Sequence, residues 1–172
     1  MTQYLLEKQE IKELCKTLSQ VFRHIEDLRK NSKIAQHIQF PKIPPKLSES
    51  IIVQLLREGI LVPELSKHQI SLGGRRADII AKKSSQELKI EVKSTGKQDF
   101  QYFGDKDVSA DYLIWLSFKD SFKNENFKEI SVTIIQPKDV ALKPGKITLK
   151  HLKNESGEKF EASTIDLEKW WK

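Results

Sequence analysis

The sequence predicts an α/β protein with a mixed central β-sheet flanked by helices and a long amphipathic helix at its N-terminus. Three observations support this class: an apolar period of three and four residues near the N-terminus, strict apolar alternation in the middle of the chain, and two later apolar runs of strand length. We expect residues 1–44 to form a helical segment with a connector. Residues 45–172 then form the sheet-bearing core and a C-terminal extension of a strand and a helix.

The N-terminal helix is expected over residues 4–30, with a seam of apolar residues about three heptads long that Glu7 interrupts. This seam is typical of a helix packed on its own domain, and it also fits a coiled-coil-like contact between two copies. Cys15 lies beside it as a buried thiol without chemistry. The seam residues are Tyr4, Ile11, Leu14, Leu18, Val21, Ile25 and Leu28.

A second helix is expected after a proline-rich connector at residues 31–46. Ser48 is placed to cap it, the helix runs over 49–58, and Gly59 ends it. Glu49 falls on the apolar flank of this helix. Either it interacts with the helix dipole in the first turn, or it faces a functional site.

Three strands should follow. The first covers 65–72 and turns through Gly73-Gly74, a two-residue hairpin signal. The next two, near 76–82 and 87–93, flank a loop at 83–86. Their apolar residues share one face if Lys82 pairs with Glu87, and this register sets Asp78 opposite Glu91. The apolar face comprises Ala77, Ile79, Ala81, Leu88, Ile90 and Val92.

Two facing carboxylates on adjacent strands repel each other by roughly 3 kcal/mol at about 5 Å and an effective dielectric near 20. Either they share a proton or a cation lies between them. Because the donors are carboxylate oxygens, the pair suits Mg²⁺ before Zn²⁺. The four histidines are scattered without zinc-ligand spacing. Lys93 follows on the same face as Glu91, as expected for metal-assisted attack of water on a phosphodiester.

The remaining chain predicts a buried strand over 112–118 with Trp115 in the core, a polar loop over 119–128, and another strand over 130–135. We expect a strand over 146–152, paired near Lys159. A short helix over 164–171 should dock its two tryptophans on the body.

Composition sets wider limits. The net charge of +6 is compatible with a polyanionic partner, although 24 acidic residues are mixed among 30 basic ones. A single cysteine excludes an internal disulfide framework and suits a reducing cytoplasm, which is the expected location. No apolar run reaches membrane-spanning length and no apolar signal core is visible at the N-terminus, so no membrane association is expected.

Asp78, twelve intervening residues and then Glu91-Val92-Lys93 resemble the bipartite motif of the PD-(D/E)xK nuclease superfamily. Ala77 stands where the motif usually has proline, and the resemblance covers roughly residues 45–137. It implies a restriction-endonuclease-like core with the order α-β-β-β-α-β. It also implies a Mg²⁺-dependent endonuclease that acts on double-stranded DNA and in which Mn²⁺ can replace Mg²⁺. By hypothesis the enzyme is a type II restriction endonuclease that acts as a homodimer.

The resemblance also implies roles for single residues. Asp78, Glu91 and the Val92 carbonyl would hold the metal ion. Lys93 would orient or deprotonate the attacking water and stabilise charge on the phosphate, while Glu49 would assist at the metal or the water.

Candidate DNA contacts are polar or basic residues near the motif and in the later loop. Gln98 and Tyr102 stand four residues apart, as in a helical motif of some relatives, and Lys97 and Lys106 are placed in sequence to meet phosphates. The full set of candidates is Arg75, Arg76, Lys97, Gln98, Tyr102, Lys119, Lys123, Asn124 and Asn126.

Alternatives to a restriction endonuclease remain. A structure-specific nuclease, such as a junction resolvase or a mobile-element nuclease, would use the same site. A DNA-binding module could retain the fold without catalysis, and the charged residues could also be ordinary surface groups on a solvated hairpin. A purely structural dimer is disfavoured, because it would leave the acid pair without a purpose.

Overall fold

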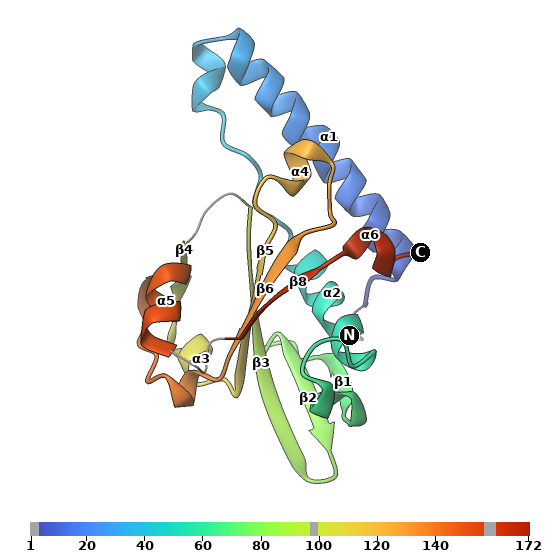
Figure 1. The fold of residues 1–172 in the computed structure, drawn as a ribbon, viewed down its shortest axis with the longest axis vertical. Coiled ribbons are helices and arrows are strands. Elements are labelled where there is room, and N and C mark those ends of the chain that lie inside the picture. Colours follow the sequence, from blue (N-terminus) through green and yellow to red (C-terminus); the bar gives the residue numbers. More distant parts are fainter. Residues whose placement is uncertain (1–3, 97–99, 157–160) are drawn as a thin grey trace.

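The computed structural model describes residues 4–96, 100–156 and 161–172. In this part of the chain six strands form one mixed sheet, in the spatial order β1 (Gln69–Leu72), β2 (Ile79–Lys83), β3 (Gln86–Thr95), β5 (Tyr112–Ser117), β6 (Ile130–Ile135) and β8 (Glu161–Ile165) (Figure 1). Within it, β3 and β5 are parallel and the other neighbours are antiparallel. The predicted α/β class with a mixed sheet is confirmed.

The two faces of this sheet are covered differently (Figure 1). Helices α1 (Lys8–Asn31) and α2 (Pro45–Arg57) cover one face, where Ile114 and Leu116 of β5 enter the larger core. The other face carries a smaller core around Trp115. Its cover is a separate two-stranded sheet of β4 (Phe100–Phe103) and β7 (Gly145–Thr148), with α3 (Asp105–Val108) and α5 (Leu149–Ser156). Trp115 is fully buried, as predicted.

The predicted register of the central hairpin is confirmed. Lys82 pairs with Glu87 and Ile79 with Ile90, so the alternating apolar residues of both strands enter the larger core. The loop is shorter than predicted, because Lys83 pairs with Gln86 and leaves a two-residue turn at 84–85. Ser84 adopts the left-handed backbone that such a turn requires.

The expected strand over 65–72 is half right, and its two-residue hairpin is wrong. A 3-10 helix, η2 (Pro63–Lys67), occupies the first half, and β1 begins only at Gln69. Leu72 pairs with Ile79, so the connection spans 73–78 rather than the two glycines alone. The proline at the start of η2 lacks a backbone donor, which is tolerated in a first helical turn but not in a central strand.

Helix α2 begins earlier than predicted. Pro45 stands in its first turn, where the missing amide is not needed, and Ser48 is buried inside the helix rather than capping it. The Ser48 hydroxyl donates to the Pro45 carbonyl at 3.0 Å. The predicted end is confirmed, since Gly59 has a positive φ of 70° and its amide donates to the Leu56 carbonyl.

Helix α1 begins at Lys8 rather than at residue 4. Glu7 and Glu10 form a capping box, in which the Glu7 amide donates to Glu10 Oε2 at 2.8 Å. Ile11, Cys15 and Phe22 are buried in the larger core, so this helix packs on the same chain. The buried stripe is rotated from the predicted seam, because Val21 and Leu28 are exposed.

The C-terminal region differs most from prediction. The expected strand over 146–152 is only partly present, because β7 ends at Thr148 and α5 follows it. β7 pairs with β4 rather than near Lys159, which lies outside the described residues. The Thr148 hydroxyl oxygen accepts from the His151 amide at 3.0 Å, so it ends the strand by capping the helix.

The predicted helix over 164–171 is half right. Residues up to Ile165 extend the sheet as β8, and only α6 (Leu167–Trp170) is helical. Both tryptophans dock on the body as expected. Trp170 Nε1 donates to Glu58 Oε2 at 2.9 Å, and the Trp171 ring lies edge-on to Phe127.

Short elements complete the described chain: η1 (Ile34–His37), α4 (Ser121–Asn124) and η3 (Pro137–Asp139). Within the described ranges, no helix is both long enough and apolar enough to cross a lipid bilayer. From α2 onward the elements follow the order α-β-β-β-α-β, with β4 inserted before the short α3.

Candidate active site

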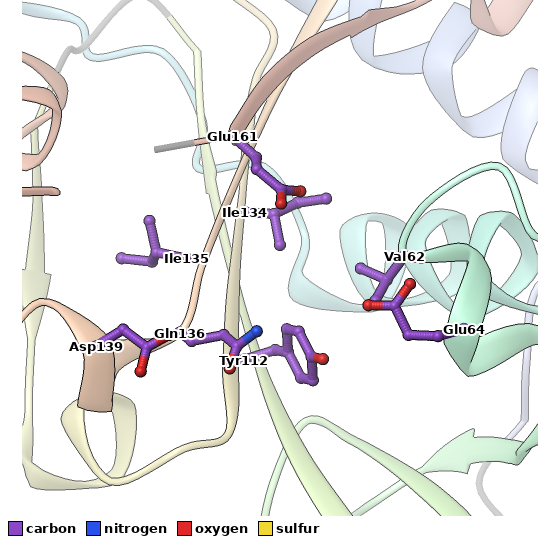
Figure 2. A pocket seen from close by; sticks show the side chains of 8 residues that line it. All are labelled: Val62, Glu64, Tyr112, Ile134, Ile135, Gln136, Asp139 and Glu161. Carbon is purple, nitrogen blue, oxygen red and sulfur yellow. The ribbon is translucent and has the colours of Figure 1, made fainter. Parts of the chain in front are cut away.

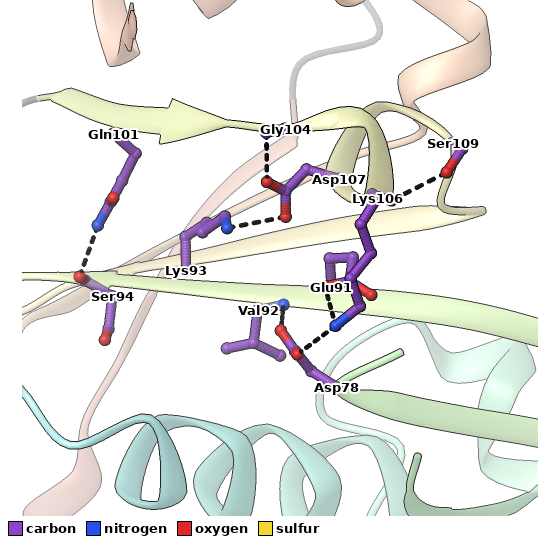
Figure 3. A network of polar contacts seen from close by, with 10 residues as sticks. All are labelled: Asp78, Glu91, Val92, Lys93, Ser94, Gln101, Gly104, Lys106, Asp107 and Ser109. Atoms are coloured by element: carbon purple, nitrogen blue, oxygen red, sulfur yellow. Dashed lines mark hydrogen bonds and ion pairs between the residues drawn. The ribbon is translucent and has the colours of Figure 1, made fainter. Parts of the chain in front are cut away.

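A tight turn between β1 and β2 delivers Asp78 to the side of β3. The Gly73 amide donates to the Asp78 carbonyl at 2.9 Å, just before β2 begins at Ile79. A Cβ on residue 73 would lie 2.6 Å from the Ala77 carbonyl oxygen, so this approach requires glycine. The Val92 amide donates to Asp78 Oδ2 at 2.9 Å and fixes the carboxylate against β3 (Figure 3).

Glu91 projects from β3 on the face opposite to Ile90 and Val92, which enter the larger core. Its side chain is only 3% exposed. Burial raises the pKa of Glu91 to about 7, and the neighbouring Asp78 carboxylate adds to this increase, while an ion pair with Lys106 opposes it. The predicted pairing of the two acids on one face is therefore present.

Lys106 of α3 supplies the cation between these acids. Its ammonium lies 2.9 Å from Asp78 Oδ1 and 3.0 Å from Glu91 Oε2 (Figure 3). Burial lowers the pKa of Lys106, but the hydrogen bonds to both acids outweigh burial and raise it. The sequence reasoning considered Lys106 only as a phosphate contact and missed this bridge, which joins residues 28 positions apart.

Lys93 lies on the same face as Glu91 and pairs with the next residue of α3. Its ammonium is 2.8 Å from Asp107 Oδ1, while Asp107 Oδ2 accepts from the Gly104 amide at 2.8 Å. Asp107 is 5% exposed. The sequence predicted that the Lys93 ammonium would face the group held by a metal ion, and it did not reveal Asp107. The only local signal for it was a glycine three residues before an aspartate, a weak sign of a helix start.

Glu49 lies in the second turn of α2 rather than in the first, because the helix begins at Pro45, and it is half-buried. Burial raises its pKa, and the Asp78 carboxylate raises it further, while Lys106 lowers it. These effects require Glu49 to lie within electrostatic range of the acid pair. Its position is consistent with a supporting acid beside the site.

The residues present fit a divalent cation. The donors are the carboxylates of Asp78 and Glu91, and Mg²⁺ commonly binds one or two carboxylates and completes its shell with water and phosphate. The Lys106 ammonium already shows that a cation is accommodated between them. Among the described residues no group of three or more His, Cys, Asp or Glu side chains is arranged to hold a metal, so the protein contributes a pair rather than a closed cage.

Arg75 and Arg76 are the DNA candidates nearest to Asp78. Both are exposed in the turn that leads into it. Tyr102 is 65% exposed, but it lies in β4 rather than in the predicted helix. Lys97 and Gln98 lie outside the described residues.

The candidates in the later loop lie beyond the C-terminal end of β5. The predicted polar loop contains α4, and Phe122 and Phe127 anchor it in the larger core. Lys119, Asn124 and Asn126 are exposed there. Lys123 is already engaged, because its ammonium pairs with Glu26 at 3.1 Å and lies over the Phe40 ring.

A separate cavity of about 170 Å³ lies beside Tyr112 (Figure 2). Glu64, Asp139 and Glu161 contribute carboxylates to its lining, and Figure 2 shows them around the Tyr112 ring. Burial raises the pKa of Tyr112, and these acids raise it further. An acidic lining repels phosphate, so this cavity is not a candidate for phosphodiester chemistry.

Comparisons with protein-family models, curated proteins and solved structures give no match for this chain. The functional interpretation therefore depends on the geometry around Asp78 and Glu91.

Proposed function

We propose that this protein is a Mg²⁺-dependent endonuclease that hydrolyses phosphodiester bonds of double-stranded DNA, with a restriction-endonuclease-like core of the PD-(D/E)xK type. One observation carries the proposal: Asp78, Glu91 and Lys93 lie on one face of a hairpin, and the ammonium group of Lys106 lies between the two acids. The parallel pairing of β3 with β5 and the α-β-β-β-α-β order also support it.

Each residue has a role in this proposal. Asp78, Glu91 and the Val92 carbonyl would hold Mg²⁺ or Mn²⁺, which when bound lowers the pKa of water and neutralises charge on the phosphate. Asp78 is held for this task by the Val92 amide. Lys93 carries a positive charge at the same face, where it orients the water or stabilises the phosphate, and Glu49 assists at the edge of the site.

The surroundings are compatible with a DNA strand. Arg75 and Arg76 are exposed next to Asp78, and the chain carries a net charge of +6. Arginine and lysine contacts to phosphates supply most of the sequence-independent affinity for DNA. We include a sequence-specific type II restriction activity in the proposal, and a cytoplasmic location, which suits a chain with a single cysteine.

A homodimer belongs to the same proposal, since two active sites cut both strands of a duplex. α1 packs on its own chain, but Val21 and Leu28 remain exposed along it. Light scattering during gel filtration, with and without duplex DNA, tests the assembly. A monomer under both conditions would contradict this part.

The experiment that tests the function is cleavage of long unmethylated duplex DNA by purified protein in Mg²⁺ and in EDTA. Asp78→Ala and Lys93→Ala are the inactive controls. Discrete Mg²⁺-dependent fragments that disappear in both variants are the expected result. Cleavage confined to branched DNA would instead favour a junction resolvase or another structure-specific nuclease.

A DNA-binding module without catalysis is the second candidate, and Lys106 is the observation that favours it. A lysine that neutralises the acid pair permanently would leave no room for a metal ion. Tight DNA binding by the wild-type protein, without turnover in Mg²⁺ or Mn²⁺ on duplex or branched DNA, would select this candidate over the nuclease.

A further inference from the structure

Lys106 reaches the acid pair from a segment inserted between the two parallel strands β3 and β5. The segment contains β4 and α3, and α3 lies over the acid-bearing face of β3 (Figure 3). The Lys106 side chain remains 44% exposed although its ammonium contacts both Asp78 and Glu91. A half-exposed lysine stem has room to adopt other rotamers.

The backbone of α3 is fixed independently of Lys106. The next residue, Asp107, pairs with Lys93 and accepts from the Gly104 amide, and both contacts are 2.8 Å long. Asp107 is also buried, so it anchors the short helix to β3. The Lys106 ammonium can therefore leave the acids by side-chain rotation alone, without movement of the helix.

A divalent ion and the ammonium compete for the same position. Mg²⁺ binds carboxylate oxygens at about 2.0–2.1 Å, so an ion shared by Asp78 and Glu91 needs the space between them. The ammonium occupies that space at 2.9 and 3.0 Å. Two cations cannot share it because their charges repel at short range.

The displaced ammonium needs a new anionic partner. Asp107 is close in the chain but is already paired with Lys93. A DNA phosphate brought to the metal ion would present non-bridging oxygens within reach of the same flexible side chain. Lysine is well suited to this contact, as a compact point charge on a flexible stem.

We propose that Lys106 is an exchangeable cation of this site, which bridges Asp78 and Glu91 until a divalent ion displaces it and then binds a non-bridging phosphate oxygen of the DNA. This inference rests on the proposed nuclease function. It adds a substrate-contacting residue to the site and explains how the repulsion between the two acids is reduced before metal arrives.

The test uses Lys106→Met, which keeps the stem and removes the charge. Lys106→Arg keeps the charge at the same position. Lys138→Met is the matched control, because Lys138 forms a comparable 2.8 Å pair with Asp111 outside the site. Thermal unfolding and circular dichroism establish that each variant is folded before it is used.

The first readout is Mn²⁺ binding without DNA, measured by calorimetry. Removing the competing charge should tighten Mn²⁺ binding to Lys106→Met by about tenfold, as expected for a lost competitor. Lys106→Arg and Lys138→Met should stay within about threefold of wild type, the scatter usual for neutral surface changes. If Lys106→Met bound Mn²⁺ as tightly as wild type or more weakly, the claim that the ion displaces the Lys106 ammonium would be wrong.

The second readout concerns the phosphate contact. At saturating Mn²⁺, Lys106→Met should cut DNA roughly 10- to 100-fold more slowly in a single turnover, despite its tighter metal binding. In Ca²⁺, the slope of log affinity against log salt should decrease by about 1 for a lost phosphate contact. An unchanged cleavage rate and salt slope would contradict the proposed phosphate contact. Lys106 would then only pair with the two acids in the absence of a metal ion.

The two levels of the proposal fail in different ways. If wild-type protein binds Mn²⁺ but cuts no DNA, the nuclease function fails, and the titration still decides whether Lys106 competes with the ion. If wild-type protein cuts DNA and Lys106→Met changes neither metal affinity nor rate, the function stands and this inference falls. If neither wild type nor Lys106→Met binds Mn²⁺, both are overturned.

Discussion

The Lys93 ammonium lies 2.8 Å from the Asp107 carboxylate, joining the acid-bearing strand β3 to the short helix α3. Asp107 is nearly fully buried, and its second oxygen caps α3 through the Gly104 amide. One side chain therefore holds the helix in place and fixes the direction of Lys93. Lys106, the next residue toward the N-terminus, depends on this anchor to reach Asp78 and Glu91.

Asp107→Ala should lower the free energy of unfolding by about 2–3 kcal/mol, since it removes a buried charged partner and a helix cap. Asp107→Asn is the matched variant, because its amide oxygen can still accept from Gly104 and it should lose about half as much. Urea unfolding followed by tryptophan fluorescence measures both. If both variants lost the same free energy of unfolding, the helix cap and the ion pair would not contribute separately.

The same pair predicts an effect on cleavage if the proposed function holds. Asp107→Asn should slow DNA cutting by about 10- to 100-fold, because Lys93 loses the group that positions it. The Mn²⁺ affinity should change little, since Asp107 contacts neither acid of the pair directly in the described structure. A large loss of metal affinity would show that Asp107 acts through the fold of α3.

Gly73→Ala should destabilise the protein by roughly 1–3 kcal/mol and weaken metal binding. The added Cβ would meet the Ala77 carbonyl oxygen at 2.6 Å and push apart the turn that delivers Asp78. Gly96→Ala is the control, because its nearest neighbour is a backbone oxygen 4.0 Å away. Thermal unfolding with and without Mn²⁺ reports both effects. Similar behaviour of the two variants would refute the requirement for glycine at residue 73.

Stability without metal should fall as pH rises from about 4.5 to about 7. Burial raises the folded-state pKa of Glu91 from its usual value to about 7, so the folded state retains a proton that the unfolded state releases. Above pH 7 the full loss of stability is present, and its upper limit is about 3–4 kcal/mol for this change in pKa.

Glu91→Gln should remove most of this decline, with a smaller part left from Glu49, whose pKa is also raised. Unfolding in EDTA at pH 4, 6 and 8 measures it. The exposed Glu87 on the same strand provides the control variant, Glu87→Gln, which should retain the wild-type decline. A Glu91→Gln protein with the wild-type pH profile would show that another group is responsible.

Cys15 should be unreactive in the folded protein. Burial raises its pKa to about 12, and the side chain is fully buried in the larger core. Because the thiolate is the reactive form, labelling with a disulfide reagent at pH 8 should be slowed by more than about 100-fold. The rate in guanidinium chloride serves as the reference for an accessible thiol. Rapid labelling under native conditions would mean that α1 detaches from the core.

The hairpin that carries Asp78 and Glu91 could be predicted from sequence because strand alternation has a period of two and one face is buried. A shift of one residue would turn Ile79 and Ile90 away from the core, so the apolar pattern alone defines the register. The end of α2 could also be predicted from the local sequence, since Gly59 takes a positive φ at that position. These features depend on residues close together in the chain.

The cation between the acids was decided by tertiary structure. Lys106 is 28 positions from Asp78, and it reaches the site because Asp107 of the same short helix is anchored on Lys93 of β3. No local pattern in the segment before Lys106 encodes that pairing. Only the first part of the strand expected over residues 146–152 forms, because the Thr148 hydroxyl oxygen accepts from the His151 amide and caps α5. Sequence periodicity thus determined where the carboxylates lie, while the tertiary contacts between α3 and β3 decided which charges face them.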